Sequence, residues 1–185
     1  MKGVRWCIPL YREDTHPIIR SRMAAPPRFM NSVYADFPDD DSTKTVYLQA
    51  PGLTYSGIGD RHVIVWWSNG CTAEARVTQV VQLTGQSGNY SYYTPVAHAQ
   101  SSSSSEEQSE ETNTQISLGR FKRAQRDRLL EVAQAVVYRK DSVVNGCSVW
   151  TRDLLQAAVG AGLLAQAKFD EADTQVPLEE RRAEA

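Results

Sequence analysis

The sequence lacks any long hydrophobic run, and this argues against a helix that spans a membrane. Its 185 residues have a mean hydropathy of −0.45, and no segment approaches the roughly 20 consecutive apolar residues that a bilayer core requires. The stretch from Met1 to Pro9 also lacks the apolar core and small-residue cleavage site of a secretory signal. We therefore expect a soluble, cytoplasmic protein.

Cysteine is scarce as well. Cys7, Cys71 and Cys147 are odd in number and lie far apart, unlike the paired cysteines of a disulfide-stabilised secreted domain, and this favours a reducing compartment. No C-x2-C or H-x3-H spacing occurs, so no metal site is predicted. The lone Gly57-Ile58-Gly59 has no helix after it and is not a phosphate-binding loop. We expect no cofactor.

A basic excess is also absent. The chain has 20 Lys and Arg residues against 22 Asp and Glu residues, a net charge of −2, whereas general binding to nucleic acid or anionic membranes needs clustered positive charge. One basic stretch does occur, with cations at positions 120, 122, 123, 126 and 128. We interpret it as the solvated face of a helix, and a nucleic-acid-binding helix ranks last among the possible functions.

What the sequence does contain is a set of short segments rich in β-branched and aromatic residues, typical of strands. They are residues 4–10, 45–49, 61–67, 75–83 and 90–96. Ser68-Asn69-Gly70 supplies turn residues, so the segments on either side of it are predicted to form an antiparallel hairpin.

Two helices are predicted to follow the strands, at residues 118–138 and 148–168, because apolar residues recur there at helical spacing. Strands followed by helices indicate an α+β fold, an antiparallel sheet of about four strands packed against two C-terminal helices. We assign residues 1–170 to one domain and residues 171–185 to a polar tail. Residues 98–116 are predicted to be a disordered insert, because positions 100–115 contain no aliphatic residue.

The strongest candidate for chemistry is Cys147, at the predicted start of the second helix. A helix N-terminus carries partial positive charge and unpaired N–H groups, which stabilise a thiolate nucleophile. Asn145-Gly146 before it permits a tight turn, and the backbone N–H of Cys147 or Ser148 could stabilise an oxyanion. The alternative is that Cys147 is simply buried in the core, as free cysteines often are.

A nucleophilic cysteine needs a base, and His62 at the start of the best strand is the favoured candidate. If the hairpin turn centres near Cys71, His62 faces Val80 and its same-face diagonal neighbours are Thr78 and Gln82. Gln82 is predicted to orient the imidazole, with Thr78 as the alternative. A slip of one residue would substitute Gln79, and His62 could also be an ordinary residue at the edge of a strand.

These parts occur in an order that resembles a group of small fungal domains with a Gly-Cys-x-x-Trp helix start. Such domains are similar in layout to circularly permuted papain-like proteins of the NlpC and lecithin–retinol acyltransferase type. The matching residues are His62 with the strand after it, Gly146-Cys147-Ser148-Val149-Trp150, and Ala161-Gly162-Leu163. The resemblance covers about residues 58–83 and 118–165. It implies Cys147 as nucleophile and His62 as base.

Two functions follow from these residues. The first is a papain-like thiol hydrolase or acyltransferase that acts on a small-molecule, peptide or acyl substrate. The second is a catalytically inactive papain-like fold that serves as a protein-interaction module. The absence of an acidic residue among the predicted neighbours of His62 and the long polar insert both leave the second function open.

We predict that limited proteolysis cuts first within residues 98–116, because a polar segment without apolar anchors is the preferred site of nicking. The two fragments should stay associated, since the insert interrupts one domain. Electrophoresis with mass spectrometry of the fragments measures this. Early cleavage within residues 120–165 would contradict the proposed domain organisation.

Overall fold

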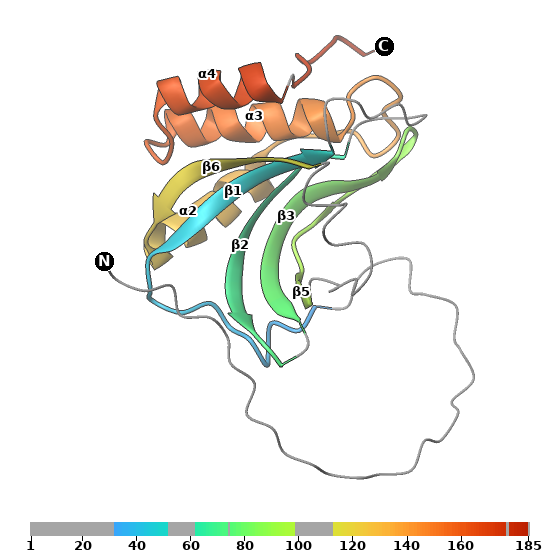
Figure 1. Cartoon of the computed structure of the whole chain (residues 1–185). Coiled ribbons are helices and arrows are strands. Elements are labelled where there is room, and N and C mark those ends of the chain that lie inside the picture. The colour runs from blue at the N-terminus through green and yellow to red at the C-terminus, as the bar shows by residue number, and fades with distance from the viewer. Residues whose placement is uncertain (1–31, 52–61, 74, 99–112, 177, 185) are drawn as a thin grey trace, which may run out of the picture.

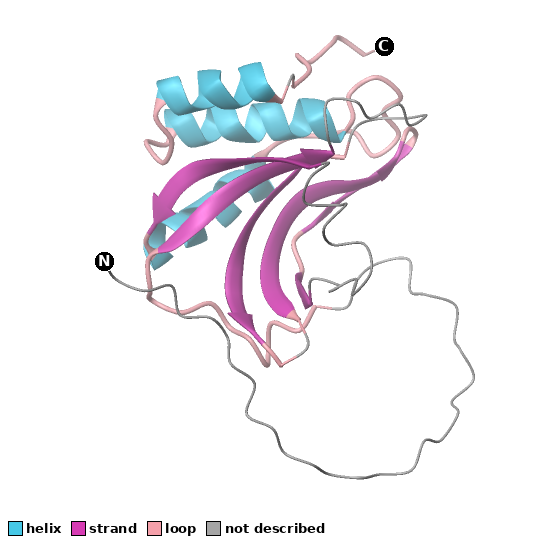
Figure 2. Cartoon of the chain, in the orientation of Figure 1, coloured by secondary structure: helices cyan, strands magenta, loops and turns pink. Residues whose placement is uncertain are grey.

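The chain folds as an antiparallel sheet followed by three helices, which confirms the predicted α+β class (Figure 1, Figure 2). The structure is a computed structural model that describes residues 32–51, 62–73, 75–98, 113–176 and 178–184. The predicted strand at residues 4–10 lies outside the described residues, as does the middle of the predicted insert, residues 99–112.

The sheet has six strands in the described part of the chain. They are β1 (Lys44–Pro51), β2 (Ile64–Cys71), β3 (Arg76–Gln86), β4 (Asn89–Tyr93), β5 (Val96–His98) and β6 (Asn113–Phe121). Their order is β4-β3-β2-β1-β6, with β5 also paired to β3. The predicted strand at residues 90–96 is divided between β4 and β5, because Pro95 between them has no N–H group to donate to a ladder.

Strand β6 is the main difference from the sequence prediction. Residues 113–116 were assigned to the insert and residues 118–121 to a helix, yet β6 pairs with β1 from Lys44↔Phe121 to Pro51↔Asn113. Only Ile116 and Leu118 alternate as buried residues within a polar stretch, which is a weak strand signal. Helix α2 (Arg123–Ala135) consequently begins later than predicted.

The second predicted helix is two helices, α3 (Cys147–Gly160) and α4 (Gln166–Gln175). Gly162 has a φ of 70°, in the left-handed region that glycine adopts without steric cost. The Leu163 N–H donates to the Ala158 carbonyl at 2.9 Å, and the Gly162 N–H donates to the Val159 carbonyl at 2.9 Å. These bonds cap α3, and the chain reverses so that α4 lies beside α3 (Figure 1).

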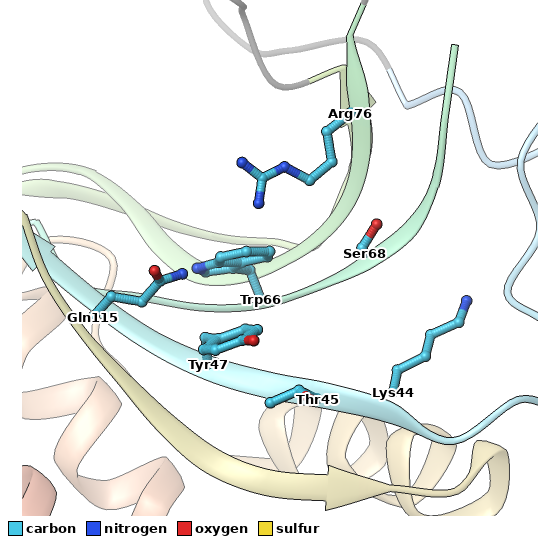
Figure 3. Close-up of a pocket in the computed structure, with 7 residues that line it drawn as sticks. All are labelled: Lys44, Thr45, Tyr47, Trp66, Ser68, Arg76 and Gln115. Atoms are coloured by element: carbon cyan, nitrogen blue, oxygen red, sulfur yellow. The ribbon is translucent and has the colours of Figure 1, made fainter. Parts of the chain in front are cut away.

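The two faces of the sheet have different surroundings. One face packs against the helices and carries alternate residues of the central strands, namely Val46, Leu48, Ala50, Val63, Val65, Trp67, Val81 and Leu83. The residues between them point to the other side, which we call the open face (Figure 3). The open face is named only for lying away from the helices. It includes Tyr47, Trp66, Val80 and Gln82, and the last three of these are at most 6% exposed. The fold therefore offers two separate environments for a functional site.

The C-terminal residues are part of the fold rather than a loose tail. Val176 is fully buried and Leu178 is 9% exposed, and both belong to the core. Asn145 and Arg182 exchange two hydrogen bonds, from the Asn145 Nδ2 to the Arg182 carbonyl at 2.8 Å and from the Arg182 N–H to the Asn145 Oδ1 at 2.9 Å. Isolated apolar residues among charges gave no periodic signal for this docking.

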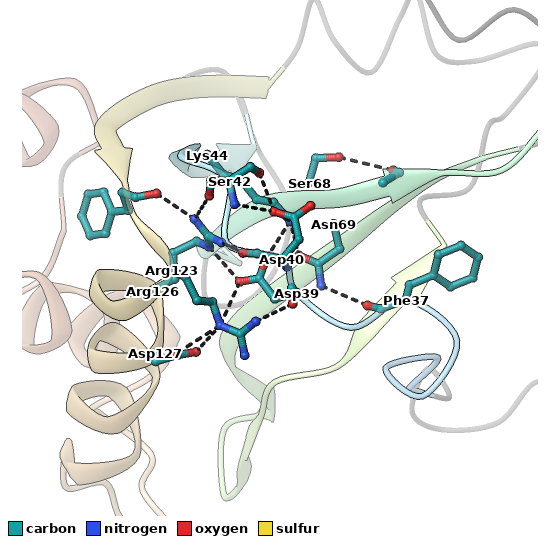
Figure 4. Close-up of polar contacts among 12 residues, drawn as sticks. Phe37, Asp39, Asp40, Ser42, Lys44, Ser68, Asn69, Arg123, Arg126 and Asp127 are labelled. Atoms are coloured by element: carbon teal, nitrogen blue, oxygen red, sulfur yellow. Dashed lines mark hydrogen bonds and ion pairs between the residues drawn. The ribbon is translucent and has the colours of Figure 1, made fainter.

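A buried ion pair joins the segment before β1 to helix α2 (Figure 4). The Arg126 Nε donates to the Asp39 Oδ2 at 2.7 Å, and the Nη2 donates to the Asp39 Oδ1 at 3.0 Å. The remaining N–H groups of Arg126 donate to the carbonyls of Asp40, Ser42 and Phe121 at 2.6, 2.8 and 2.7 Å. The Lys44 Nζ also donates to Asp39, at 2.6 Å. All five donors of this guanidinium are thus satisfied.

This ion pair corrects the interpretation of the basic stretch as a solvated helix face. The Arg126 side chain is 0% exposed, whereas Arg128 is exposed and pairs with Glu131 on the surface at 2.7 Å. The sequence could not separate these two arginines, because Asp39 lies 87 residues away from Arg126.

We expect Asp39→Asn to lower the free energy of unfolding by about 3–5 kcal/mol at neutral pH, because it leaves the buried Arg126 without its counter-ion. Burial alone would raise the pKa of Asp39, but hydrogen bonds and charges from Arg126 and Lys44 outweigh it and hold the pKa below its usual 3.8. The carboxylate therefore stabilises the fold above the pKa it has when unfolded. That contribution is lost as the pH falls through the lower pKa of the folded state.

Urea unfolding from neutral to acidic pH measures this effect. The difference in stability between the native chain and Asp39→Asn should shrink below about pH 4. Asp127→Asn is the matched control, because its carboxylate pairs with Arg123 but is 48% exposed, and it should cost at most about 1 kcal/mol. A difference that does not change with pH would contradict the assigned role of Asp39.

Candidate functional sites on the two faces of the sheet

Cys147 is the first residue of α3, at the helix start that the sequence predicted. The N-cap residue is Gly146, which has no side chain to cap the helix, so the first N–H groups of α3 receive no side-chain cap bond. The thiol is not in a disulfide, and the residue is only 4% exposed, within the same hydrophobic core cluster as Trp150. A helix start favours a thiolate, whereas apolar surroundings disfavour one.

His62 and Gln82 lie side by side. The His62 Nε2 is 2.7 Å from the Gln82 Oε1, and Gln82 is 5% exposed while His62 is exposed. The amide oxygen is an acceptor, so the Nε2 carries the proton and donates it to this bond. The lone pair of a neutral His62 ring is then at Nδ1, which is the nitrogen that could act as a base.

The contact between His62 and Gln82 occurs although the predicted hairpin register was wrong. The observed pairs include Trp66↔Val80 and Val65↔Val81. Continuing this register places His62 opposite Thr84 instead of Val80. The shift is an even number of residues, so each side chain stays on its predicted face and Gln82 remains a diagonal neighbour of His62.

The two alternative partners of His62 have other neighbours. Thr78 pairs with Ser68, farther along the hairpin. The Gln79 amide donates to the carbonyls of Thr94 at 2.9 Å and Pro95 at 3.1 Å, so it holds the chain between β4 and β5.

Cys147 and His62 belong to opposite faces of the sheet. Gln82 lies between Val81 and Leu83, which both pack in the same core cluster as Cys147. Successive side chains of a strand alternate between faces. Gln82 and the His62 that contacts it therefore lie on the open face, while Cys147 lies on the helix side. The structure brings two of the three predicted residues together and places the third across the sheet.

Cys71 differs from its predicted state. It is the last residue of β2, pairs with Arg76 across the hairpin, and is disulfide-bonded. The expectation that the cysteines form no disulfide therefore does not hold for Cys71, whereas Cys147 is outside any disulfide.

The open face carries a three-layer stack that the sequence prediction missed (Figure 3). The rings of Tyr47 and Trp66 are stacked, with centroids 4.8 Å apart and planes 25° apart. The Arg76 guanidinium lies over the Trp66 ring, 5.2 Å from its centroid, on the side away from Tyr47. The stacking of the two rings contributes about 0.5–1.5 kcal/mol to the stability of the fold, and the cation over the indole contributes a similar amount.

A pocket of about 360 Å³ lies beside this stack. Its wall consists of Lys44, Thr45, Tyr47, Trp66, Ser68, Arg76 and Gln115. Successive residues of a strand point to opposite faces, so Trp66-Trp67 could have indicated an aromatic residue on the open face. The sequence could not show that Tyr47 lies opposite Trp66, because these residues pair only through the β1–β2 register.

The described residues offer no metal site and no membrane span. Within them, no group of three or more His, Cys, Asp or Glu side chains is arranged to hold a metal ion. None of the helices that the structure describes combines the length and the apolar character needed to cross a bilayer.

Comparison of the chain with known protein families, with curated proteins and with solved structures gives no significant match to any of them. The geometry of the two faces is therefore the evidence for its function.

We expect the neutral His62 ring to be the Nε2–H tautomer, because its Nε2 faces the amide oxygen of Gln82. Nitrogen-15 NMR of the imidazole distinguishes a protonated from an unprotonated ring nitrogen. Gln82→Leu should remove this preference, since leucine keeps the size but offers no acceptor. His98, at the end of β5, serves as the internal control whose signals should stay unchanged. A protonated Nδ1 in the native chain would show that the amide of Gln82 is turned the other way.

Proposed function

We propose that this chain is a non-catalytic binding module whose contact surface is the open face of the sheet. One observation carries the proposal. The candidate nucleophile Cys147 packs in the helix-side core, while the candidate base His62 bonds to Gln82 on the open face. A thiol and an imidazole on opposite faces of a sheet cannot exchange a proton directly, because the transfer requires hydrogen-bond contact.

In this proposal Cys147 is a structural residue of the start of α3. Trp150, one turn later, is 1% exposed and packs against Tyr92 with ring centroids 5.7 Å apart. The segment around the thiol is held by the C-terminal residues, since the Glu179 N–H donates to the Ser148 Oγ at 3.1 Å. These contacts favour a helix start that is fixed for packing and not opened for a substrate.

The resemblance to circularly permuted papain-like proteins enters here as part of the proposal. An antiparallel sheet followed by a helix that begins at Gly146-Cys147 supports this layout. The proposal treats the chain as a descendant that keeps the arrangement of elements and has lost the catalytic pairing. Its partner would be a protein or a small ligand bound on the open face.

A papain-like thiol hydrolase or acyltransferase is the second candidate, and one contact favours it. The His62–Gln82 hydrogen bond of 2.7 Å is the kind of contact that orients a catalytic imidazole and leaves its other nitrogen available as a base. This function requires a rearrangement that brings His62 to the helix side, next to Cys147. Its substrate would be an ester, amide or acyl compound.

We predict that Cys147 of the folded protein reacts with iodoacetamide at least about tenfold more slowly than N-acetylcysteine at neutral pH, because labelling of a buried thiol requires local opening. His62→Ala should leave the pH profile of labelling unchanged, since the two residues lie on different faces. Cys71 should be labelled only after reduction. Mass spectrometry of peptides after timed labelling measures all three rates.

Cys147→Ser identifies the labelled peptide, and unfolding in urea shows the full reactivity of the thiol. If Cys147 instead reacts faster than N-acetylcysteine near neutral pH, and His62→Ala removes that advantage, the thiol enzyme replaces the binding module as the better proposal.

A further inference from the structure

We propose that strand β6 is the edge at which two copies of this chain associate, so that their sheets join into one continuous antiparallel sheet. The partner is a second copy of the chain, and the contact is made by the straight part of β6, residues 113–117. This inference goes beyond the proposed function, because it concerns the edge of the sheet and does not depend on what binds to the open face.

The two edges of the sheet differ in how their backbone groups are used. β6 is the last strand of the order, and within the described residues it pairs with β1 alone (Figure 1). At the other edge, the loop between α2 and α3 lies along β4, where the N–H groups of Gly88 and Tyr90 donate to the carbonyls of Ser142 and Lys140 at 2.7 and 2.8 Å. That edge is therefore covered, whereas an uncovered edge strand offers its N–H and C=O groups to another chain.

The straight part of β6 lacks the residues that protect an edge strand from pairing. Many natural edges carry charged side chains or proline, which prevent association. The segment Asn113-Thr114-Gln115-Ile116-Ser117 contains neither, and its length matches the usual strand length of about 5–6 residues. The side chains of Gln115 and Ser117 are exposed, so the open-face side of this edge is accessible to another chain.

The ladder between β1 and β6 limits which part of β6 is regular enough to pair. Residues 113–117 pair with residues 47–51 without interruption, and the register then shifts between Val46 and Tyr47. An irregularity of this kind bends the strand and increases its twist locally. We therefore assign the contact to the straight part, whose middle residue is Gln115.

Two-fold symmetry then fixes the cross-strand pairs. Most homodimers have a two-fold axis, and each copy contributes the same surface to the contact. Cross-strand neighbours share a face of the sheet, so an axis through Gln115 keeps the helices of both copies on the same side. This axis places Gln115 opposite the partner's Gln115 on the open face. It places Ile116, which is 4% exposed on the helix side, opposite the partner's Thr114, and β-branched pairs of this kind stabilise a sheet.

The proposed pairing opposes no like charges, because the straight part contains no charged side chain. Like charges directly opposite each other destabilise a cross-strand pair. Gln115 also belongs to the pocket wall that includes Tyr47, so the pockets of the two copies would lie beside each other at the axis, on one common face of the joined sheet.

The central pair provides a test that depends on the register. Gln115→Lys and Gln115→Glu each place two like charges opposite each other on the axis, so each variant alone should dimerise roughly fivefold more weakly than the native chain. A one-to-one mixture of the two variants should form a heterodimer at least as tight as the native homodimer, because the opposed charges then attract. Sedimentation velocity over a wide range of protein concentration measures the affinities, and native mass spectrometry with one variant isotopically labelled identifies the heterodimer.

Gln86→Lys is the matched control. Gln86 is the exposed last residue of β3, in the hairpin that leads to β4 at the other edge, and this variant should dimerise as the native chain does. In the native chain, hydrogen exchange should show that amides within residues 113–117 gain protection as the protein concentration rises, while those of β4 do not. The proposal is overturned if the native chain stays monomeric at the highest concentration, if the mixture associates no more tightly than each variant alone, or if Gln86→Lys weakens the dimer as much as Gln115→Lys.

Discussion

The two-residue alternation of the β-strands is the constraint on which the rest of this structure depends. Because neighbouring side chains of a strand point to opposite sides, the sheet divides the chain into a helix-side core and an open face. Cys147 belongs to the core and the His62–Gln82 pair belongs to the open face. The same rule that makes this a stable two-layer fold therefore separates the residues that a thiol enzyme would need together.

The open face also holds the aromatic stack and the pocket beside it. Tyr47 and Trp66 come from adjacent strands and meet only because β1 and β2 pair in one register. The neighbouring Lys44 is fixed by Asp39, which in turn is held by Arg126 of α2. The buried ion pair thus extends to the pocket wall through Lys44, and the position of that residue depends on the packing of α2.

Much of the fold could be predicted because its signals are local. The hairpin of β2 and β3 follows from two runs of β-branched and aromatic residues around a turn, and the start of α3 at Cys147 follows from Asn145-Gly146. Strand β6 could not be predicted in the same way. Its residues are mostly polar, and they become a strand because β1 offers them a partner. Gln82 was correctly placed beside His62 although the predicted register was wrong. A register error of an even number of residues leaves every side chain on the same face of the sheet.

The sequence by itself determined the α+β class, the hairpin, the helix start at Cys147 and the face on which each hairpin residue lies, because these depend on periodicity and turn chemistry over a few residues. Only the tertiary structure decided that Arg126 is buried against Asp39, that Tyr47 stacks on Trp66 and that Cys147 and His62 lie on different sides of the sheet. These outcomes depend on which distant segments pair and pack. A contact with a distant segment produces no recognisable periodicity in the local sequence.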